Sequence, residues 1–126
     1  MLDHVDFAVT DLENSRRFYT RVLATLGIEP FTDIKTDDGR EGTGYGSLGG
    51  PQFWIGGGKS VKGRMHIAFS ANARTEVDAF YEAALQVGGK CKGPPGLRPR
   101  YGEHYYAAFI IDPDGHTIEA VCRHDE

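Results

Sequence analysis

Apolar and polar residues alternate along two short stretches of the chain, residues 2–9 and residues 65–70. Successive side chains of an extended strand point to opposite faces, so this alternation predicts a strand at each place. In the first stretch the apolar face consists of Val5, Phe7 and Val9. Each predicted strand therefore has one face suited to a hydrophobic core and a second face left for other contacts.

A stretch with the apolar spacing of an amphipathic helix follows each predicted strand. In the first, Asp11 is a typical N-cap residue and Gly27 is placed to end the helix. The second helix is expected to end before Gly88 in the same way. The apolar stripes are Phe18, Tyr19, Val22, Leu23 and Leu26 in the first helix, and Val77, Phe80, Tyr81, Ala84 and Leu85 in the second. Further strands are expected at about 41–48, 51–56, 104–111 and 117–122.

The two strand–helix stretches repeat one another at a fixed spacing. Residues 4 and 66 are both histidine, and the separation of 62 positions between them recurs. The further matches at this separation are Phe7 with Phe69, Phe18 with Phe80, Tyr19 with Tyr81, Leu23 with Leu85, and Gly27 with Gly89. We interpret the chain as one domain, residues 1–126, made of two copies of one module (about 1–57 and 63–126) joined by a linker at about 56–63. Two such modules can pair their sheets around a cleft, with the helices outside.

Composition narrows the classes of function. A length of 126 residues and a charged content of 25% are typical of one globular domain. The net charge of −4 and the absence of an evident basic face disfavour nucleic acid as a partner. Cys91 and Cys122 form no CxxC pair, which favours a reducing compartment. No apolar run is long enough to span a membrane and no signal peptide is recognisable, so we expect a cytoplasmic protein.

Three strings of the sequence, together with the repeat, carry a resemblance to a known family. They are LDHVDFAVTDLENSRRFY (2–19), RMHIAF (64–69) and DPDGHTIEAV (112–121). They resemble the glyoxalase/bleomycin resistance/extradiol dioxygenase superfamily, also called vicinal oxygen chelate proteins, over essentially the whole chain. The resemblance implies an α+β fold of two βαβββ modules that pair into a curved, cup-shaped mixed sheet, with a divalent metal where the modules meet.

The resemblance also implies which residues bind that metal. The ligands of the first strands correspond to His4 and His66, and the ligand of the last strand of module two corresponds to Glu119. In the last strand of module one, PQFWIG, the corresponding position is taken by Gln52. True glyoxalase I proteins have a glutamate there, so lactoylglutathione lyase activity is not assured. Two imidazoles and one carboxylate suit Ni, Mn, Fe, Zn or Co and leave coordination positions open for substrate oxygens.

The residues by themselves leave the direction of Glu119 open. It shares one strand face with Thr117 and Val121, and both faces of that strand are mixed in polarity. The carboxylate could face solvent or a site, and only the resemblance favours the site. His116, beside the DPDG turn, is interpreted as a surface residue.

Other candidates flank the predicted metal. Trp54 shares a strand face with Gln52, so it is expected to line the cleft and could stack on a flat ligand. Asp6 lies two residues beyond His4, on the same face, and could orient a ligand or act as a base. An ordinary core tryptophan and a solvated aspartate are the competing interpretations.

The segment GLRPRYGEHYY (96–106) is expected to form a loop over the cleft. Arg98 or Arg100 could bind a substrate carboxylate, and His104 could be a general acid or base. Alternation with Ala107 and Phe109 directs Tyr105 toward the cup, so Tyr105 and Phe109 are candidate substrate contacts. A solvated surface loop is the competing interpretation.

We therefore expect a divalent-metal-dependent enzyme of the lyase or isomerase type that acts on a small oxygenated substrate, with Glu119, Asp6 and His104 as candidate catalytic residues. A metal-free binding protein of the bleomycin resistance type is one alternative. A thiol-transfer or dioxygenase enzyme on the same scaffold is another. A homodimer is expected in each case.

Overall fold

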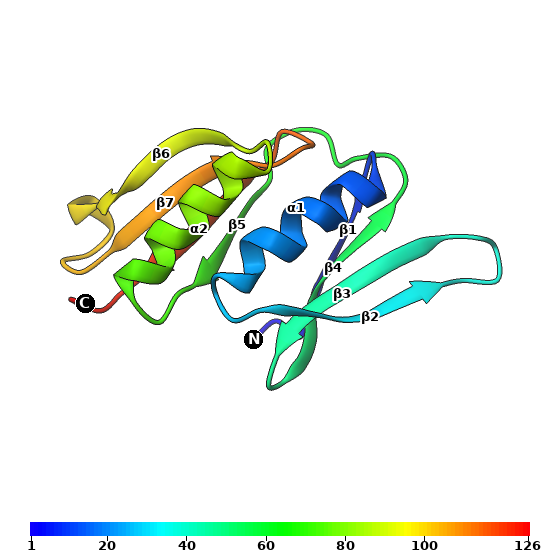
Figure 1. Cartoon of the computed structure of the whole chain (residues 1–126), viewed down its shortest axis with the longest axis horizontal. Coiled ribbons are helices and arrows are strands. Elements are labelled where there is room, and N and C mark those ends of the chain that lie inside the picture. Colours follow the sequence, from blue (N-terminus) through cyan, green and yellow to red (C-terminus); the bar gives the residue numbers. More distant parts are fainter.

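The computed structural model describes residues 1–126 and consists of two modules of the same construction (Figure 1). The first contains β1 (Val5–Val9), α1 (Leu12–Ala24), β2 (Glu29–Lys35), β3 (Glu41–Ser47) and β4 (Gly50–Gly57). The second contains β5 (His66–Ser70), α2 (Arg74–Gln86), β6 (Lys90–Leu97), the short 3-10 helix η1 (Pro99–Tyr101), β7 (Tyr106–Ile111) and β8 (Thr117–Cys122). The α+β class and the two βαβββ modules predicted from the sequence are thus confirmed.

Each module forms a four-stranded mixed sheet, and the two strand orders are equivalent. The orders are β1-β4-β3-β2 and β5-β8-β7-β6. In each sheet the first strand pairs in parallel with the last, and the other pairings are antiparallel. The first and last strands of each module are therefore neighbours, which positions residues far apart in the sequence side by side.

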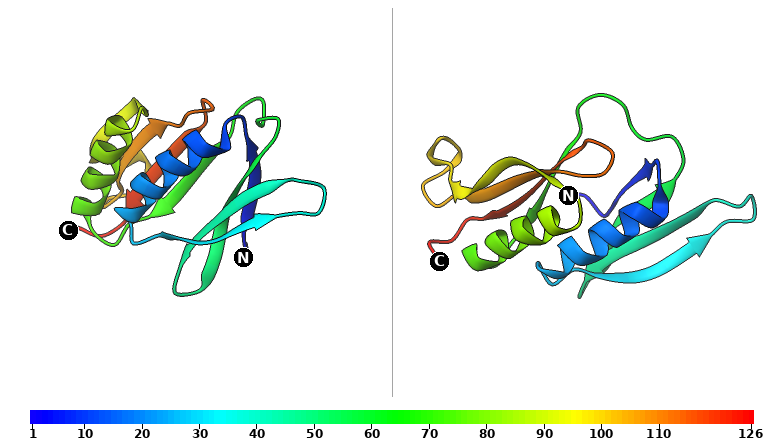
Figure 2. Two further views of the ribbon diagram at one scale, coloured as in Figure 1. Left: turned by 45° about the vertical axis from the view of Figure 1, so that its right-hand side comes forward. Right: turned by 45° about the horizontal axis from the view of Figure 1, so that its top comes forward.

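The two helices lie side by side, each over its own sheet (Figures 1 and 2). Asp11 caps α1, because its side chain accepts a hydrogen bond from the backbone N–H of Asn14 at 3.1 Å. Gly27 then takes a positive φ of 74°, as expected for the residue that ends the helix. The apolar stripe of α2 differs from the prediction at Leu85, which is 38% exposed, whereas Ala83 is buried.

Two strands, β2 and β6, fall outside the ranges that the sequence predicted. Every residue of β2 is exposed, so its sequence has no buried face to reveal it. β6 contains Pro94 and Pro95, and its pairing with β7 shifts register twice. Both are edge strands, where such irregularities are tolerated.

One hydrophobic core joins the modules, with Phe53 of β4 at its centre. Its ring lies 5.4 Å from that of Phe7, 5.0 Å from that of Tyr19 and 5.1 Å from that of Phe69, measured between centroids. Phe69 belongs to β5 of module two. The helix-facing sides of both sheets therefore pack into the same interior, and the opposite sides remain open.

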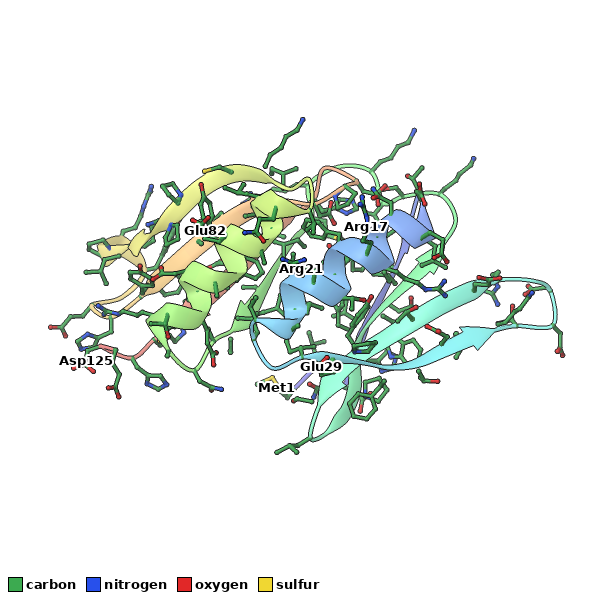
Figure 3. All side chains as sticks on the ribbon, viewed as in Figure 1. Met1, Arg17, Arg21, Glu29, Glu82 and Asp125 are labelled. Carbon is green, nitrogen blue, oxygen red and sulfur yellow. The ribbon has the colours of Figure 1, made fainter.

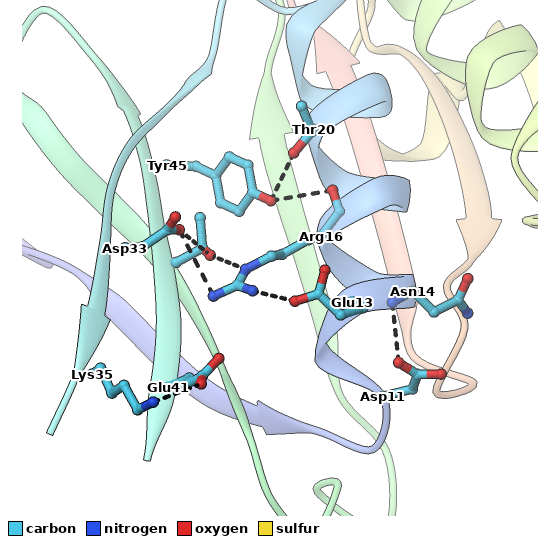
Figure 4. Close-up of polar contacts among 10 residues, drawn as sticks. Asp11, Glu13, Asn14, Arg16, Thr20, Asp33, Lys35, Glu41 and Tyr45 are labelled. Atoms are coloured by element: carbon cyan, nitrogen blue, oxygen red, sulfur yellow. Dashed lines mark hydrogen bonds and ion pairs between the residues drawn. The ribbon is translucent and has the colours of Figure 1, made fainter. Parts of the chain in front are cut away.

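Polar contacts fix the outer strands of module one to α1 (Figure 4). Arg16 donates from Nε to Thr43 Oγ1 at 2.6 Å, and Thr43 donates to Asp33 Oδ1 at 2.7 Å. The buried Tyr45 hydroxyl lies 3.0 Å from Thr20 Oγ1. These contacts hold the β2–β3 hairpin, which projects past α1 in Figure 1.

The DPDG turn is a junction between the modules. Asp112 is buried, and its Oδ2 accepts a hydrogen bond from Tyr19 of α1 at 2.5 Å. Its Oδ1 accepts from the backbone N–H groups of Asp114 and His116 at 2.9 and 2.8 Å. Asp114 in turn accepts from the backbone N–H of Thr10 at 3.1 Å. The turn thus binds both the end of β1 and the middle of α1.

The prediction that His116 is a surface residue is wrong. It is only 3% exposed, because the inter-module linker and β1 cover it. Its Nε2 lies 3.0 Å from the carbonyl oxygen of Val61, and its ring packs edge-on against Phe7.

None of the helices is both long enough and apolar enough to cross a membrane.

Candidate metal and substrate site

The parallel pairing of β5 with β8 brings His66 and Glu119 together. Ala68 is the register partner of Glu119, and His66 lies two residues before it on the same open face. His66 Nε2 is 2.7 Å from Glu119 Oε1. The neighbours of Glu119 along the strand, Ile118 and Ala120, are in the core. The carboxylate therefore points away from the helix side, into the site.

Tyr105 fixes the other carboxylate oxygen. Its hydroxyl donates to Glu119 Oε2 at 2.5 Å. Burial, and then the hydrogen bond to Glu119, raises the pKa of Tyr105 to about 12, so it stays protonated as a donor. The guanidinium of Arg123 covers the Tyr105 ring at 4.8 Å from its centroid. Both oxygens of Glu119, which is 2% exposed, are thus oriented by neighbours.

The single chain does not bring His4 into this group. Its side chain is 55% exposed, lies just before β1, and contacts Asp3 at 2.6 Å. No three side chains of the His, Cys, Asp and Glu types converge so that they could hold a metal ion. Of the four predicted ligands, only His66 and Glu119 are therefore adjacent.

Strand register corrects the assumed equivalence of Gln52 and Glu119. Asp6 of β1 is the partner of Trp54, and Ala68 of β5 is the partner of Glu119. Asp6 and Ala68 are equivalent in the 62-residue repeat. The counterpart of Glu119 in module one is consequently Trp54, whereas Gln52 lies two residues earlier and is exposed. The sequence alone does not give the pairing register of the two last strands, so it cannot show which of their residues are equivalent.

Trp54 lies on the open face of the first sheet, over Gly44. A Cβ on Gly44 would come within 2.8 Å of its indole ring, so the glycine makes room for it. Trp54 and Asp6 line a depression of about 310 Å³, with Ile34 and Arg40 at the side of the β2–β3 hairpin. Asp6 therefore faces a potential ligand space on module one, away from His66.

A second depression, of about 410 Å³, surrounds His66 on module two. Its lining residues are Arg64, His66, Lys92, Gly93, Arg98, Arg100, Tyr101, Phe109 and Thr117. The predicted substrate contacts Arg100 and Phe109 are among them. His104 is not, because it is exposed on the loop before β7, with Nε2 3.9 Å from Glu103. Sequence reasoning missed Arg64 and Lys92, since isolated basic residues resemble any solvated charge.

A protein-family model described as Glyoxalase/Bleomycin resistance protein/Dioxygenase superfamily matches residues 1–120. Among solved structures, a glyoxalase/bleomycin resistance protein from Albidiferax ferrireducens T118 is 33% identical, with 98% of this chain and 99% of that chain covered and a TM-score of 0.79. No curated protein was found that matches the chain.

Two more distant structures show the same fold. A mutant of the fosfomycin resistance protein FosX from Listeria monocytogenes, in complex with Mn(II) and 1S,2S-dihydroxypropylphosphonic acid, is 22% identical, with 96% of this chain and 90% of that chain covered and a TM-score of 0.70. A glyoxalase I mutant from Zea mays is 23% identical, with 97% of this chain but 46% of that chain covered and a TM-score of 0.72. At these identities the likeness concerns the fold alone.

Proposed function

The chain belongs to the glyoxalase/bleomycin resistance protein/dioxygenase superfamily, and on that basis we propose that it is a divalent-metal-dependent enzyme of the lyase or isomerase type. Its substrate is a small oxygenated molecule. The observation that carries this proposal is the pair of His66 and Glu119, 2.7 Å apart on an open sheet face. Superfamily membership alone would not decide the matter, because members of the family include binding proteins as well as enzymes.

The donor set of this pair fits a metal of the Mn, Fe, Co, Ni or Zn type. An imidazole nitrogen and a carboxylate oxygen already lie side by side, and such metals accept both. The metal, when bound, supplies Lewis-acid polarisation of a substrate oxygen. Tyr105 holds the carboxylate in one orientation through its hydrogen bond to Oε2. The Mn(II) in the Listeria FosX structure supports a metal of this class.

We further propose that a second copy of the chain supplies His4. The open face of module one, with His4 and Trp54, and that of module two, with His66 and Glu119, each contain part of a site. β1 and β5 each pair with a neighbour on one side only, so both edges are free for association. Phe31 and Ile34 of β2 are 51% and 46% exposed, which is apolar surface that a partner would cover.

Metal analysis of purified protein tests the enzyme proposal. Protein loaded with Mn(II), Fe(II) or Ni(II) and then desalted should retain metal, and His66→Ala or Glu119→Gln should remove most of it. His124→Ala is the matched control, because His124 is an exposed histidine near the C-terminus. Failure of every metal to bind the unchanged protein would refute the proposal and leave a metal-free binding protein.

Subunit mixing tests the shared site. His4→Ala and His66→Ala variants should each bind little metal. After joint unfolding and refolding, mixed dimers would contain one site with both histidines. About half of the mixed dimers' sites should then regain metal affinity. No recovery, or a monomer by light scattering, would contradict a site shared between copies.

A further inference from the structure

Four basic side chains converge on the depression around His66 and have no acidic partner. They are Arg64, Lys92, Arg98 and Arg100. None of them forms an ion pair, in a chain whose net charge is −4. We infer that this depression binds an oxyanion, a phosphate, phosphonate or carboxylate group of the substrate. The inference names the substrate class of the proposed enzyme and rests on that proposal only for the link to catalysis.

Arg98 is held in place before any ligand binds. Its Nη2 donates to the carbonyl oxygen of Pro94 at 2.6 Å, and its guanidinium lies 5.4 Å from the centroid of the Phe109 ring. A Cβ on Gly93 or Gly96 would come within 3.2 or 3.1 Å of the guanidinium nitrogens. The two glycines thus leave room for the planar group. A guanidinium has five N–H donors, so several remain for an anion.

Lys92 of β6 reaches across the sheet to the strand beside His66. Its Nζ donates to Thr117 Oγ1 at 2.7 Å, and Thr117 is the register partner of His66 on β5. The His66 ring also packs edge-on against Phe109, at 5.9 Å between centroids. Because Arg98 covers that same Phe109 ring, an anion bound by Lys92 and Arg98 lies beside His66.

The carboxylate of Glu119 lies next to His66 but is not part of the lining of this depression. Both oxygens of Glu119 are already bound, one by His66 and the other by Tyr105. None of the four basic groups forms an ion pair with Glu119 or with any other side chain, so an anion from solution would reduce their mutual repulsion. A substrate with an oxyanion at this end would place its remaining oxygens next to the His66–Glu119 pair.

Calorimetric titration with inorganic phosphate, and separately with sodium acetate, tests the inference. The protein is freed of metal on a chelating resin, because soluble polycarboxylate chelators are themselves anions. Ionic strength is held constant, since surface charge effects depend on it. We expect saturable phosphate binding that weakens at least about tenfold in the Lys92→Gln/Arg98→Gln double variant. Arg98→Lys keeps the positive charge but loses the planar guanidinium with its paired N–H donors. Its phosphate affinity should lie between that of the unchanged protein and that of the double variant.

The control is Arg17→Gln, which removes one charge from α1 (Figure 3), where the side chain of Arg17 hydrogen-bonds to Asn14. It should bind phosphate within about twofold of the unchanged protein. Melting temperatures of all variants show that each is folded. No saturable binding of either anion, or equal weakening in Arg17→Gln, would overturn the inference. Tighter acetate than phosphate binding would identify a carboxylate. Because no metal is present, these outcomes are independent of whether His66 and Glu119 bind one.

Discussion

The buried hydrogen bond between Tyr19 and Asp112 should be a principal link between the modules, and Tyr19→Phe tests it. The substitution keeps the ring, which is fully buried in the core. It removes only the hydroxyl, which donates to Asp112 Oδ2 at 2.5 Å. Both backbone donors of the turn bind the other oxygen, Oδ1. In the variant, Oδ2 therefore has no hydrogen-bond donor.

The size of the effect follows from this arrangement. A hydrogen bond to a buried charged group contributes about 1.5–3 kcal/mol, and leaving the charge unpaired places the loss near the upper end. His116 Nδ1 is 3.6 Å from Oδ2 and is itself buried without a partner, so a small shift could recover part of the loss. We therefore expect a loss of about 2 kcal/mol, or roughly 6–10 °C in melting temperature for a domain of this size.

Thermal unfolding followed by circular dichroism measures this loss, with Tyr101→Phe as the control. Tyr101 is 55% exposed and its hydroxyl forms no hydrogen bond, so its loss should change the melting temperature by about 1 °C at most. A Tyr19→Phe variant as stable as this control would refute the reasoning. Unchanged stability would mean that the junction does not depend on the bond.

The remaining predictions concern alkaline stability and the two open sheet faces. Burial, and then the charge of Asp112, raises the pKa of Tyr19 well above its usual range, so the unfolded state loses the hydroxyl proton at a lower pH than the folded state does. The free energy of unfolding should therefore fall above about pH 10, and it should fall more steeply than in Tyr19→Phe. Gly44→Ala should displace the single tryptophan and shift its fluorescence emission. Gly57→Ala is the control and should leave the emission unchanged, because its Cβ would meet no atom closer than 3.9 Å. Tyr105→Phe should weaken metal affinity about tenfold in a metal titration without loss of the fold. Trp54→Glu should tighten metal binding more than Gln52→Glu, because strand register makes Trp54 the counterpart of Glu119. The reverse order would contradict this equivalence of Trp54 and Glu119.

Much of the fold could be predicted because the repeat doubles each signal. The 62-residue spacing between His4 and His66 aligned two strands and two helices, and the alternating patterns located them. β2 and β6 escaped prediction because edge strands lack a buried face or contain prolines. The burial of His116 could not be predicted, since the linker that covers it is adjacent only in space.

The site was predictable only in part, for a related reason. Alternation showed that Glu119 and Thr117 share a face, but the choice of face depends on which neighbours are in the core. The convergence of Lys92 and Arg98 depends on β6, a strand that the sequence did not reveal. Position along the chain suggests Gln52 as the counterpart of Glu119, whereas the pairing of first and last strands across the sheet makes Trp54 its counterpart.

That pairing also explains how two copies of one module serve different purposes. Equivalent register positions hold Trp54 in module one and Glu119 in module two. Module one therefore presents the indole ring of Trp54, for which Gly44 leaves room, and module two presents a carboxylate oriented by Tyr105. A site assembled from both faces would hold a metal through three protein side chains, His4, His66 and Glu119, and the metal would supply polarisation of a substrate oxygen. Divergence at this one position would favour catalysis at an open metal over a closed, purely structural one.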